Sequence, residues 1–266
     1  MQNGHYGGAV NAGCLLWMPK LDTLEYRDTM ASLLYMQLAA TKKHSPFQHP
    51  HEWHQVFSGG LQQFGWAPLS HGYREHAAKG DFTLGQLAAA EWGMPRTQAQ
   101  QAAWDMLYTQ MAQRLADDPV LTLLQGHMAG TLSTDTANGP LEPAATESRC
   151  PSPGADNLAM AGGPEPRGKP FHAPAHTAIT VQFGLLLPGR RIQLLFLHFA
   201  TRALAGENLF RQLFTAKEVL GNIQVKSFFA ELSEQQYGQV RQRFSSLLQP
   251  HWDKQVAEHL PLGGKP

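Results

Sequence analysis

The segment TKKHSPFQHPHEWHQVF, residues 41–57, carries four histidines: His44, His49, His51 and His54. On a helix, His51 and His54 would share a face because they are three residues apart, and a His-x-x-His pair can chelate a transition metal. A third ligand could come from any of four residues, namely His49, Glu52, His71 or His76. The chemistry that this pattern offers is metal- or histidine-dependent catalysis.

The same residues also suit the start of an ordinary helix. Pro50 is favoured in a first turn, and Glu52 complements the positive end of the helix dipole. The apolar residues Trp53, Phe57 and Leu61 recur at the spacing of a buried stripe. The segment also lacks the HExxH pattern of zinc proteases. We favour the structural interpretation, with the histidines in solvent, and keep a metal site as the alternative, with the ligands His51, His54, His71 and His76.

Other catalytic and binding signatures are missing from the sequence. There is no GxSxG, GxxxxGK[ST] or GxGxxG motif. Lys+Arg and Asp+Glu balance at 21 each, so no net charge attracts nucleic acid, and we expect no nucleic-acid partner. The longest apolar tract is interrupted by PGRR, which excludes a continuous transmembrane helix there. The first residues lack the basic and apolar regions of a secretory signal, so we expect synthesis in the cytoplasm and any release by a non-classical route.

The two cysteines, Cys14 and Cys150, are candidates for modification. Cys150 lies among small residues in SRCPSPG, where an accessible thiol could accept a fatty acyl chain or form an intermolecular disulfide. Cys14 adjoins the apolar run LLWM, which could pack in a core or meet a membrane. The alternative is that Cys14 is a small buried hydrophobe and Cys150 an incidental thiol, since neither has an obvious activating partner.

Hydrophobic periodicity predicts the elements that position these residues. Helices are expected at 22–43, at 52–64, after a Thr83 cap, and over 96–119, where Pro119 would close a helix with Leu115 on its apolar face. GWAPLSHGYREHA predicts a short exposed strand between them. The runs HTAITVQFGLLL and RIQLLFLHFATRAL flank PGRR and predict a hairpin with an exposed basic tip around Gly189.

The C-terminal part predicts one more strand and a helix. NIQVKSFFAEL has strand character, SEQQYGQVRQRFSSLL has a capping-box pattern at Ser233 and Gln236, and HWDKQVAEHL suggests a last helical turn. Residues 130–174 are rich in Pro, Gly, Ala, Ser and Thr and predict a flexible insertion. Together these patterns predict a single α+β domain over 1–266, with a helical N-terminal half and a mostly antiparallel sheet covered by helices on one face.

Two blocks of this sequence resemble a known family. The first is LEYRDTMASLLYMQLAATKK followed by EWHQVFSGGLQQFGWAPLSHGYREH and DFTLGQLAAAEW, and the second is LLFLHFATRA followed by SFFAELSEQQYGQVRQRFSSLL. Their order is similar to that of the bacterial virulence-factor family named for the Erwinia virulence factor. The resemblance implies an α+β fold without an assigned enzyme activity, a role in bacterial persistence or toxicity in an insect host, and a fatty acyl chain such as palmitate on a cysteine.

This chain departs from the family at the acylated position. The resemblance places that cysteine near the start of the first hairpin strand, where the sequence reads FHAPAHTAITV without a cysteine. Cys150 is the nearest cysteine upstream. The resulting expectation is a non-enzymatic virulence or toxin-like protein acting at a host surface or on membrane lipid. The alternatives are a metal- or histidine-dependent enzyme and a protein-interaction module that uses residues 130–174 for recognition.

Overall fold

The computed structural model describes residues 6–19, 23–92, 97–132 and 176–261. The strands are β1 Tyr6–Asn11, β2 Cys14–Pro19, β3 Trp66–His76, β4 Ala129–Leu132, β5 His176–Leu187, β6 Arg191–Thr201, β7 Val219–Leu232 and β8 Val256–Pro261. The helices are α1 Thr23–Lys43, α2 Pro50–Gln63, α3 Leu84–Glu91, α4 Gln98–Gln113, α5 Pro119–Gly126, α6 Glu234–Gly238 and α7 Arg241–Gln255.

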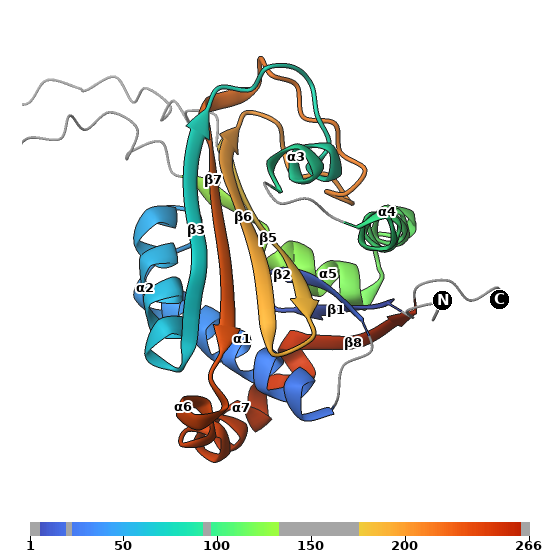
Figure 1. The fold of residues 1–266 in the computed structure, drawn as a ribbon. Helices are drawn as coiled ribbons and strands as arrows, with labels where there is room; N and C mark the ends of the chain where they lie inside the picture. The colour runs from blue at the N-terminus through green and yellow to red at the C-terminus, as the bar shows by residue number, and fades with distance from the viewer. Residues whose placement is uncertain (1–5, 20–22, 93–96, 133–175, 262–266) are drawn as a thin grey trace, which may run out of the picture.

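The eight strands form one sheet in the order β3-β7-β6-β5-β2-β1-β8, and β4 also pairs with β5 (Figure 1). β2 and β5 run parallel, and the other described strand pairs run antiparallel. The α+β class with a mostly antiparallel sheet is therefore confirmed.

Helices cover both faces of this sheet, so the expectation that they pack on one face is wrong (Figure 1). One core lies between the sheet and α1, α2, α6 and α7, and the other lies between the sheet and α3, α4 and α5. β5 supplies Leu186 to the first core and Phe183 to the second. The physical reason is visible in β5, which is buried at every position between its two end residues. A strand that is apolar on both sides needs cover on both faces.

The N-terminal half is not purely helical, because the described chain begins with the β1–β2 hairpin. β1 also pairs with β8 near the other end of the chain. The helical turn predicted for 251–260 is correct only up to Gln255, where α7 ends and β8 begins. Pairing with β1, more than two hundred residues away, is what makes Val256–Pro261 a strand.

The helix predicted over 96–119 is two helices. α4 ends at Gln113, and Pro119 is in the first turn of α5, behind the N-cap Asp118. Proline is common both in the first turn of a helix and just after the end of one. The position of Pro119 therefore did not show whether it ends one helix or begins another. Leu115 lies in the link between α4 and α5 and is exposed, which corrects its placement on a buried face.

Several local predictions are confirmed. The structure contains α1, α2, the exposed strand β3, α3 behind a Thr83 capping box, and the β5–β6 hairpin. Gly189 and Arg190 both have positive φ in the hairpin turn, at +78° and +57°. Ser233 caps α6 by accepting a hydrogen bond from the Gln236 N–H, but α6 ends at Gly238 and α7 is a separate helix.

Gly130 to Leu132 belong to β4, where Leu132 lies opposite His176 of β5. Residues 133–175 therefore join two neighbouring strands, as an insertion does. These residues, with Cys150 and most of the proposed recognition segment, lie outside the described part of the chain. Among the described helices, none combines the length and apolar character needed to cross a membrane.

Candidate functional site

The histidine-rich segment runs from the end of α1 into α2: His44 and His49 precede α2, and His51 and His54 lie in its first turns, as the structural interpretation predicts. Pro50 begins the helix and Glu52 lies in its first turn. Trp53, Phe57 and Leu61 are buried against the sheet. His51 is exposed, whereas His54 is partly buried with its ring centre 5.2 Å from that of Phe196 on β6. The expectation that His54 lies in solvent is therefore wrong.

A lysine, Lys226 of β7, faces these histidines. Its side chain is only 5% exposed, and its Nζ lies 3.5 Å from Nδ1 of His51. The same Nζ lies 5.8 Å from the ring centres of Tyr73 and Phe196, which is a distance at which an aromatic face attracts a cation. His198, on the neighbouring strand, is buried, and its Nδ1 lies 2.8 Å from Oγ1 of Thr180. Lys226 is not among the residues that the sequence pattern indicates, because its only signal is a single cation in a predicted strand.

The electrostatics of this cluster keep two histidines neutral. Burial, followed by the charges of Lys226 and His51, lowers the pKa of His54 to about 3. Burial and then Lys226 lower the pKa of His198 to about 4. Burial also lowers the pKa of the Lys226 ammonium to about 8, although Glu52 acts in the opposite direction. A metal cation placed between these histidines would meet the positive charge of Lys226.

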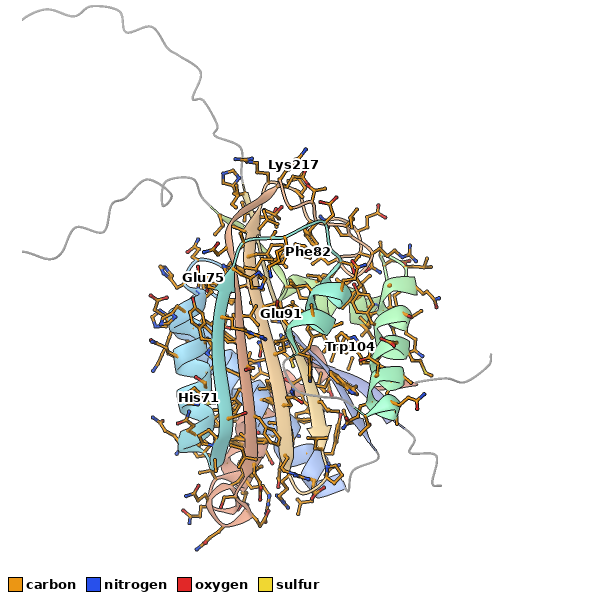
Figure 2. All side chains as sticks on the ribbon, turned by 45° about the horizontal axis from the view of Figure 1, so that its top comes forward. His71, Glu75, Phe82, Glu91, Trp104 and Lys217 are labelled. Carbon is orange, nitrogen blue, oxygen red and sulfur yellow. The ribbon has the colours of Figure 1, made fainter. Side chains whose placement is uncertain are left out.

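The four proposed metal ligands are not brought together. His71 and His76 both lie on β3, but they are five residues apart, so their side chains point to opposite faces of the strand. His71 lies opposite Phe228, whose side chain is in the α2-side core, while His76 lies opposite Ile223 of the other core. His76 Nε2 is 2.8 Å from Glu91 Oε1 of α3, across the sheet from α2 (Figure 2). Among the described residues, no group of three or more His, Cys, Asp or Glu side chains could hold a metal ion.

Cys14 is a core residue of β2. It is 1% exposed, and burial raises the pKa of its thiol far above the ordinary value. The lining of a nearby cavity of about 40 Å³ includes Gly13, Gln37, Trp53 and Thr180. Pockets that bind small molecules usually measure roughly 300–1,000 Å³, so this cavity has room for water and not for a fatty acyl chain. The structure thus favours Cys14 as a small buried hydrophobe.

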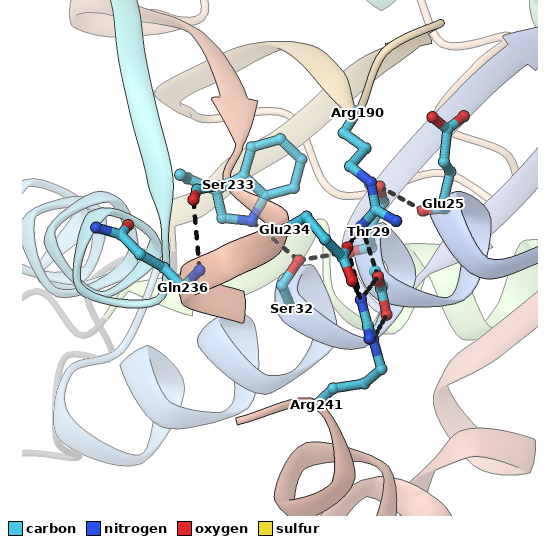
Figure 3. Close-up of polar contacts among 10 residues, drawn as sticks. Glu25, Thr29, Ser32, Arg190, Ser233, Glu234, Gln236 and Arg241 are labelled. Atoms are coloured by element: carbon cyan, nitrogen blue, oxygen red, sulfur yellow. Dashed lines mark hydrogen bonds and ion pairs between the residues drawn. The ribbon is translucent and has the colours of Figure 1, made fainter. Parts of the chain in front are cut away.

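A buried carboxylate, Asp28 of α1, is held by two arginines, Arg190 and Arg241, which Figure 3 labels. Arg190 Nη1 donates to Asp28 Oδ2 at 2.8 Å, and Arg241 donates to both carboxylate oxygens, each at 2.8 Å. Glu234 contacts Arg241 at 2.6 Å and balances the second positive charge. The hydrogen bonds from Arg241 to Asp28 and Glu234 raise the pKa of its guanidinium.

This ion cluster fixes the hairpin tip to α1, α6 and α7. Two carboxylates match two guanidinium groups, so the cluster is electrically balanced without a ligand. The predicted basic tip is therefore wrong for Arg190, whose side chain is 16% exposed and paired, and correct for the exposed Arg191. The role of the ion cluster is structural, because Arg190 and Arg241 are both paired with carboxylates of the same chain.

The three most exposed leucines of the described residues belong to two segments that contact each other. Leu204 and Leu213 lie between β6 and β7, and Leu115 lies between α4 and α5, with exposures of 76%, 56% and 71%. The segments are joined by hydrogen bonds from Asn208 to the carbonyls of Met111 and Arg114. We call the part of the molecule built by these two segments the leucine end.

Comparison with known protein families and curated proteins gives no function for these residues. No protein-family model and no curated protein matches the chain.

Proposed function

We propose that this protein is a non-enzymatic bacterial virulence or toxin-like protein that acts at a host membrane surface through the leucine end. The supporting observation is the exposure of Leu115, Leu204 and Leu213 on contacting segments. Exposed apolar side chains that form one patch are typical of sites that meet membranes or other proteins, and the proposal is that these three leucines form such a patch. The resemblance to the virulence-factor family supports the host as the source of that membrane.

The described residues on either side of 133–175 also fit this proposal. Leu132 and His176 lie opposite each other, and Thr177 of β5 lies opposite Thr201 of β6. Thr201 precedes Leu204 by three residues. The two residues that flank the segment with Cys150 therefore lie beside the strand end from which the leucine end begins.

An acyl chain on Cys150 and the leucines would act together at the membrane. One acyl chain contributes about 0.8 kcal/mol per buried CH₂ and by itself gives marginal, reversible binding, so stable attachment needs a second contact. Leu115, Leu204 and Leu213 supply that contact in this proposal.

The test is co-sedimentation of the protein from its native producer with liposomes of host lipid composition. We expect the Leu115→Ser/Leu204→Ser/Leu213→Ser variant to bind at least about tenfold more weakly, since three leucines lose part of the roughly 1.5–3 kcal/mol that each gains on full burial. The control is Leu24→Ser/Leu247→Ser, which changes two exposed leucines on α1 and α7. Equal weakening in both variants, or none in the first, would contradict the proposal.

Intact mass of the same material tests the acyl chain. A hydroxylamine-labile fatty acyl increment that disappears in Cys150→Ser and persists in Cys14→Ser is expected. An unmodified mass in the native protein would remove the acyl chain from the proposal, and the liposome experiment would then test the leucines alone.

A further inference from the structure

β3 is an edge strand that leaves a long part of the sheet open. It pairs with β7 on one side and ends the strand order, so no strand of the described residues lies on its other side. From Ala67 to Glu75 every residue is exposed, including the large apolar side chains of Leu69 and Tyr73. His71 and Glu75 mark this strand in Figure 2. An exposed edge carries unpaired N–H and C=O groups, which are a template for pairing with another strand.

One half of this edge is obstructed and the other is regular. Pro68 cannot donate a backbone hydrogen bond, and the register with β7 shifts between Pro68 and Ser70. From Ser70 to His76 the register continues without a shift and without proline. These seven residues, SHGYREH, are where an additional strand can pair.

The pairing with β7 fixes which side chains of this stretch share a face. His71, Tyr73 and Glu75 lie opposite Phe228, Lys226 and Gln224, on the α2 side of the sheet. Gly72 and Arg74 lie on the other side, because side chains alternate along a strand. Glu75 is already oriented, since it accepts hydrogen bonds from the Tyr73 hydroxyl at 2.8 Å and from Asn222 Nδ2 at 3.3 Å.

The sequence of this stretch is complementary to itself when read in the opposite direction. An antiparallel pair centred on Tyr73 places His71 of each copy opposite Glu75 of the other, and it places Arg74 opposite Gly72, which leaves room for the long side chain. An imidazole directly across from a carboxylate can donate a hydrogen bond to it, which favours the pair. A pair centred on Gly72 has no such match, and a pair centred on Arg74 puts two arginines directly opposite each other.

We infer that β3 pairs with β3 of a second copy of this chain, antiparallel and centred on Tyr73, so that two sheets join across a two-fold axis. A two-fold axis makes the same patch meet itself, which is the commonest way in which identical chains associate. The inference is independent of the leucine end, which lies on other segments.

Site-directed cross-linking tests the register. In a Cys150→Ser background, Tyr73→Cys is expected to give an interchain product with a short bismaleimide, because opposite residues of an antiparallel pair lie about 5 Å apart at Cα. The matched control is Ser70→Cys on the same strand. Its two copies would be separated by six residues of strand, roughly 20 Å, and should not react. Buried Cys14 can be left in place.

Sedimentation velocity tests the charge pairing without a cross-linker. His71→Glu places two carboxylates opposite each other at both ends of the pair, and we expect the dimer dissociation constant to rise at least about tenfold. His71→Lys places a positive charge opposite Glu75 and should remain dimeric. The double variant His71→Glu/Glu75→Lys restores opposite charges and should recover the dimer.

Three outcomes would overturn the inference. The first is a monomeric wild-type chain at every concentration, and the second is equal cross-linking of Tyr73→Cys and Ser70→Cys. The third is a link formed within one chain between position 73 and Cys150 when Cys150 is retained. That result would show that residues 133–175 occupy the edge in place of a second copy.

Discussion

At the scale of single residues, one lysine, Lys226, determines the electrostatic environment of the histidines of α2. Lys226 places a positive charge beside His54 and His198, and with burial it keeps both histidines neutral by lowering the pKa of each. His54 packs against the sheet and His198 belongs to its strand β6, so protonating either one places a second positive charge in a confined region with little water. The cluster therefore stabilises the fold only while its histidines are uncharged.

This arrangement predicts a loss of stability in mild acid. His198 has a folded-state pKa of about 4 against an ordinary value of 6.5, so the unfolded chain binds its proton more readily. Its contribution is fully present above pH 6.5 and is lost as the pH falls toward 4. Between pH 7 and pH 5 this amounts to up to about 2 kcal/mol of the free energy of unfolding.

Urea unfolding of wild type and His198→Asn at pH 7 and pH 5 measures the effect. Asparagine can keep the contact with Thr180 but does not titrate, so the variant should lose less stability than wild type between the two pH values. The control is His251→Gln, because His251 is exposed and its replacement should leave the pH dependence of stability unchanged. The same pH dependence in His198→Asn as in wild type would contradict the assignment to His198.

At the scale of elements, the passage from α2 into β3 depends on a glycine. Gly65 has φ of +98°, and a Cβ there would lie 3.0 Å from Cβ of Gln236 in α6. Residues with a side chain rarely adopt this conformation. The sharp turn is what starts β3 directly after α2, so that the edge strand runs beside β7.

Gly65→Ala should therefore lower the free energy of unfolding by about 1–3 kcal/mol, through backbone strain and the contact with Gln236. The matched control is Gly59→Ala within α2, where a Cβ meets nothing within 4 Å. Alanine at that position should raise stability by up to about 1 kcal/mol, because it favours the helix over the unfolded chain. Chemical denaturation measures the change in the free energy of unfolding, which should be negative for Gly65→Ala and positive for Gly59→Ala.

At the scale of the whole molecule, the two cores share the same strands. Alternate side chains of β5, β6 and β7 lie in the core beneath α1 and α2, here the α1–α2 core, and in the core beneath α3, α4 and α5, here the α3–α5 core. Loss of packing on one face should therefore disturb the strands that hold the other face. This geometry predicts one cooperative unit rather than two layers that unfold separately.

Trp104→Ala in the α3–α5 core tests this coupling. The substitution should destabilise the chain by about 3–5 kcal/mol. In a Cys150→Ser background, the urea midpoint for labelling of Cys14, which lies in the opposite core, should fall together with the midpoint from far-UV circular dichroism. An unchanged Cys14 midpoint would show that the two faces unfold independently.

What the sequence determined by itself was local. The cap at Thr83, the proline that begins α2 and the turn between β5 and β6 each depend on residues within a few positions of one another, and each was predicted. The extended strand β3 was also predicted, because its residues are polar and no helical period competes with it.

Only the tertiary structure decided the arrangement of these elements and the nature of the site. Asp28 lies 162 residues from Arg190 and 213 from Arg241, so no local spacing could reveal the ion cluster. Lys226 comes from β7 and reaches His51 across 175 positions. Contacts at such separations depend on which face of the sheet each helix covers. That arrangement is set by the burial of both apolar faces of the sheet at the same time.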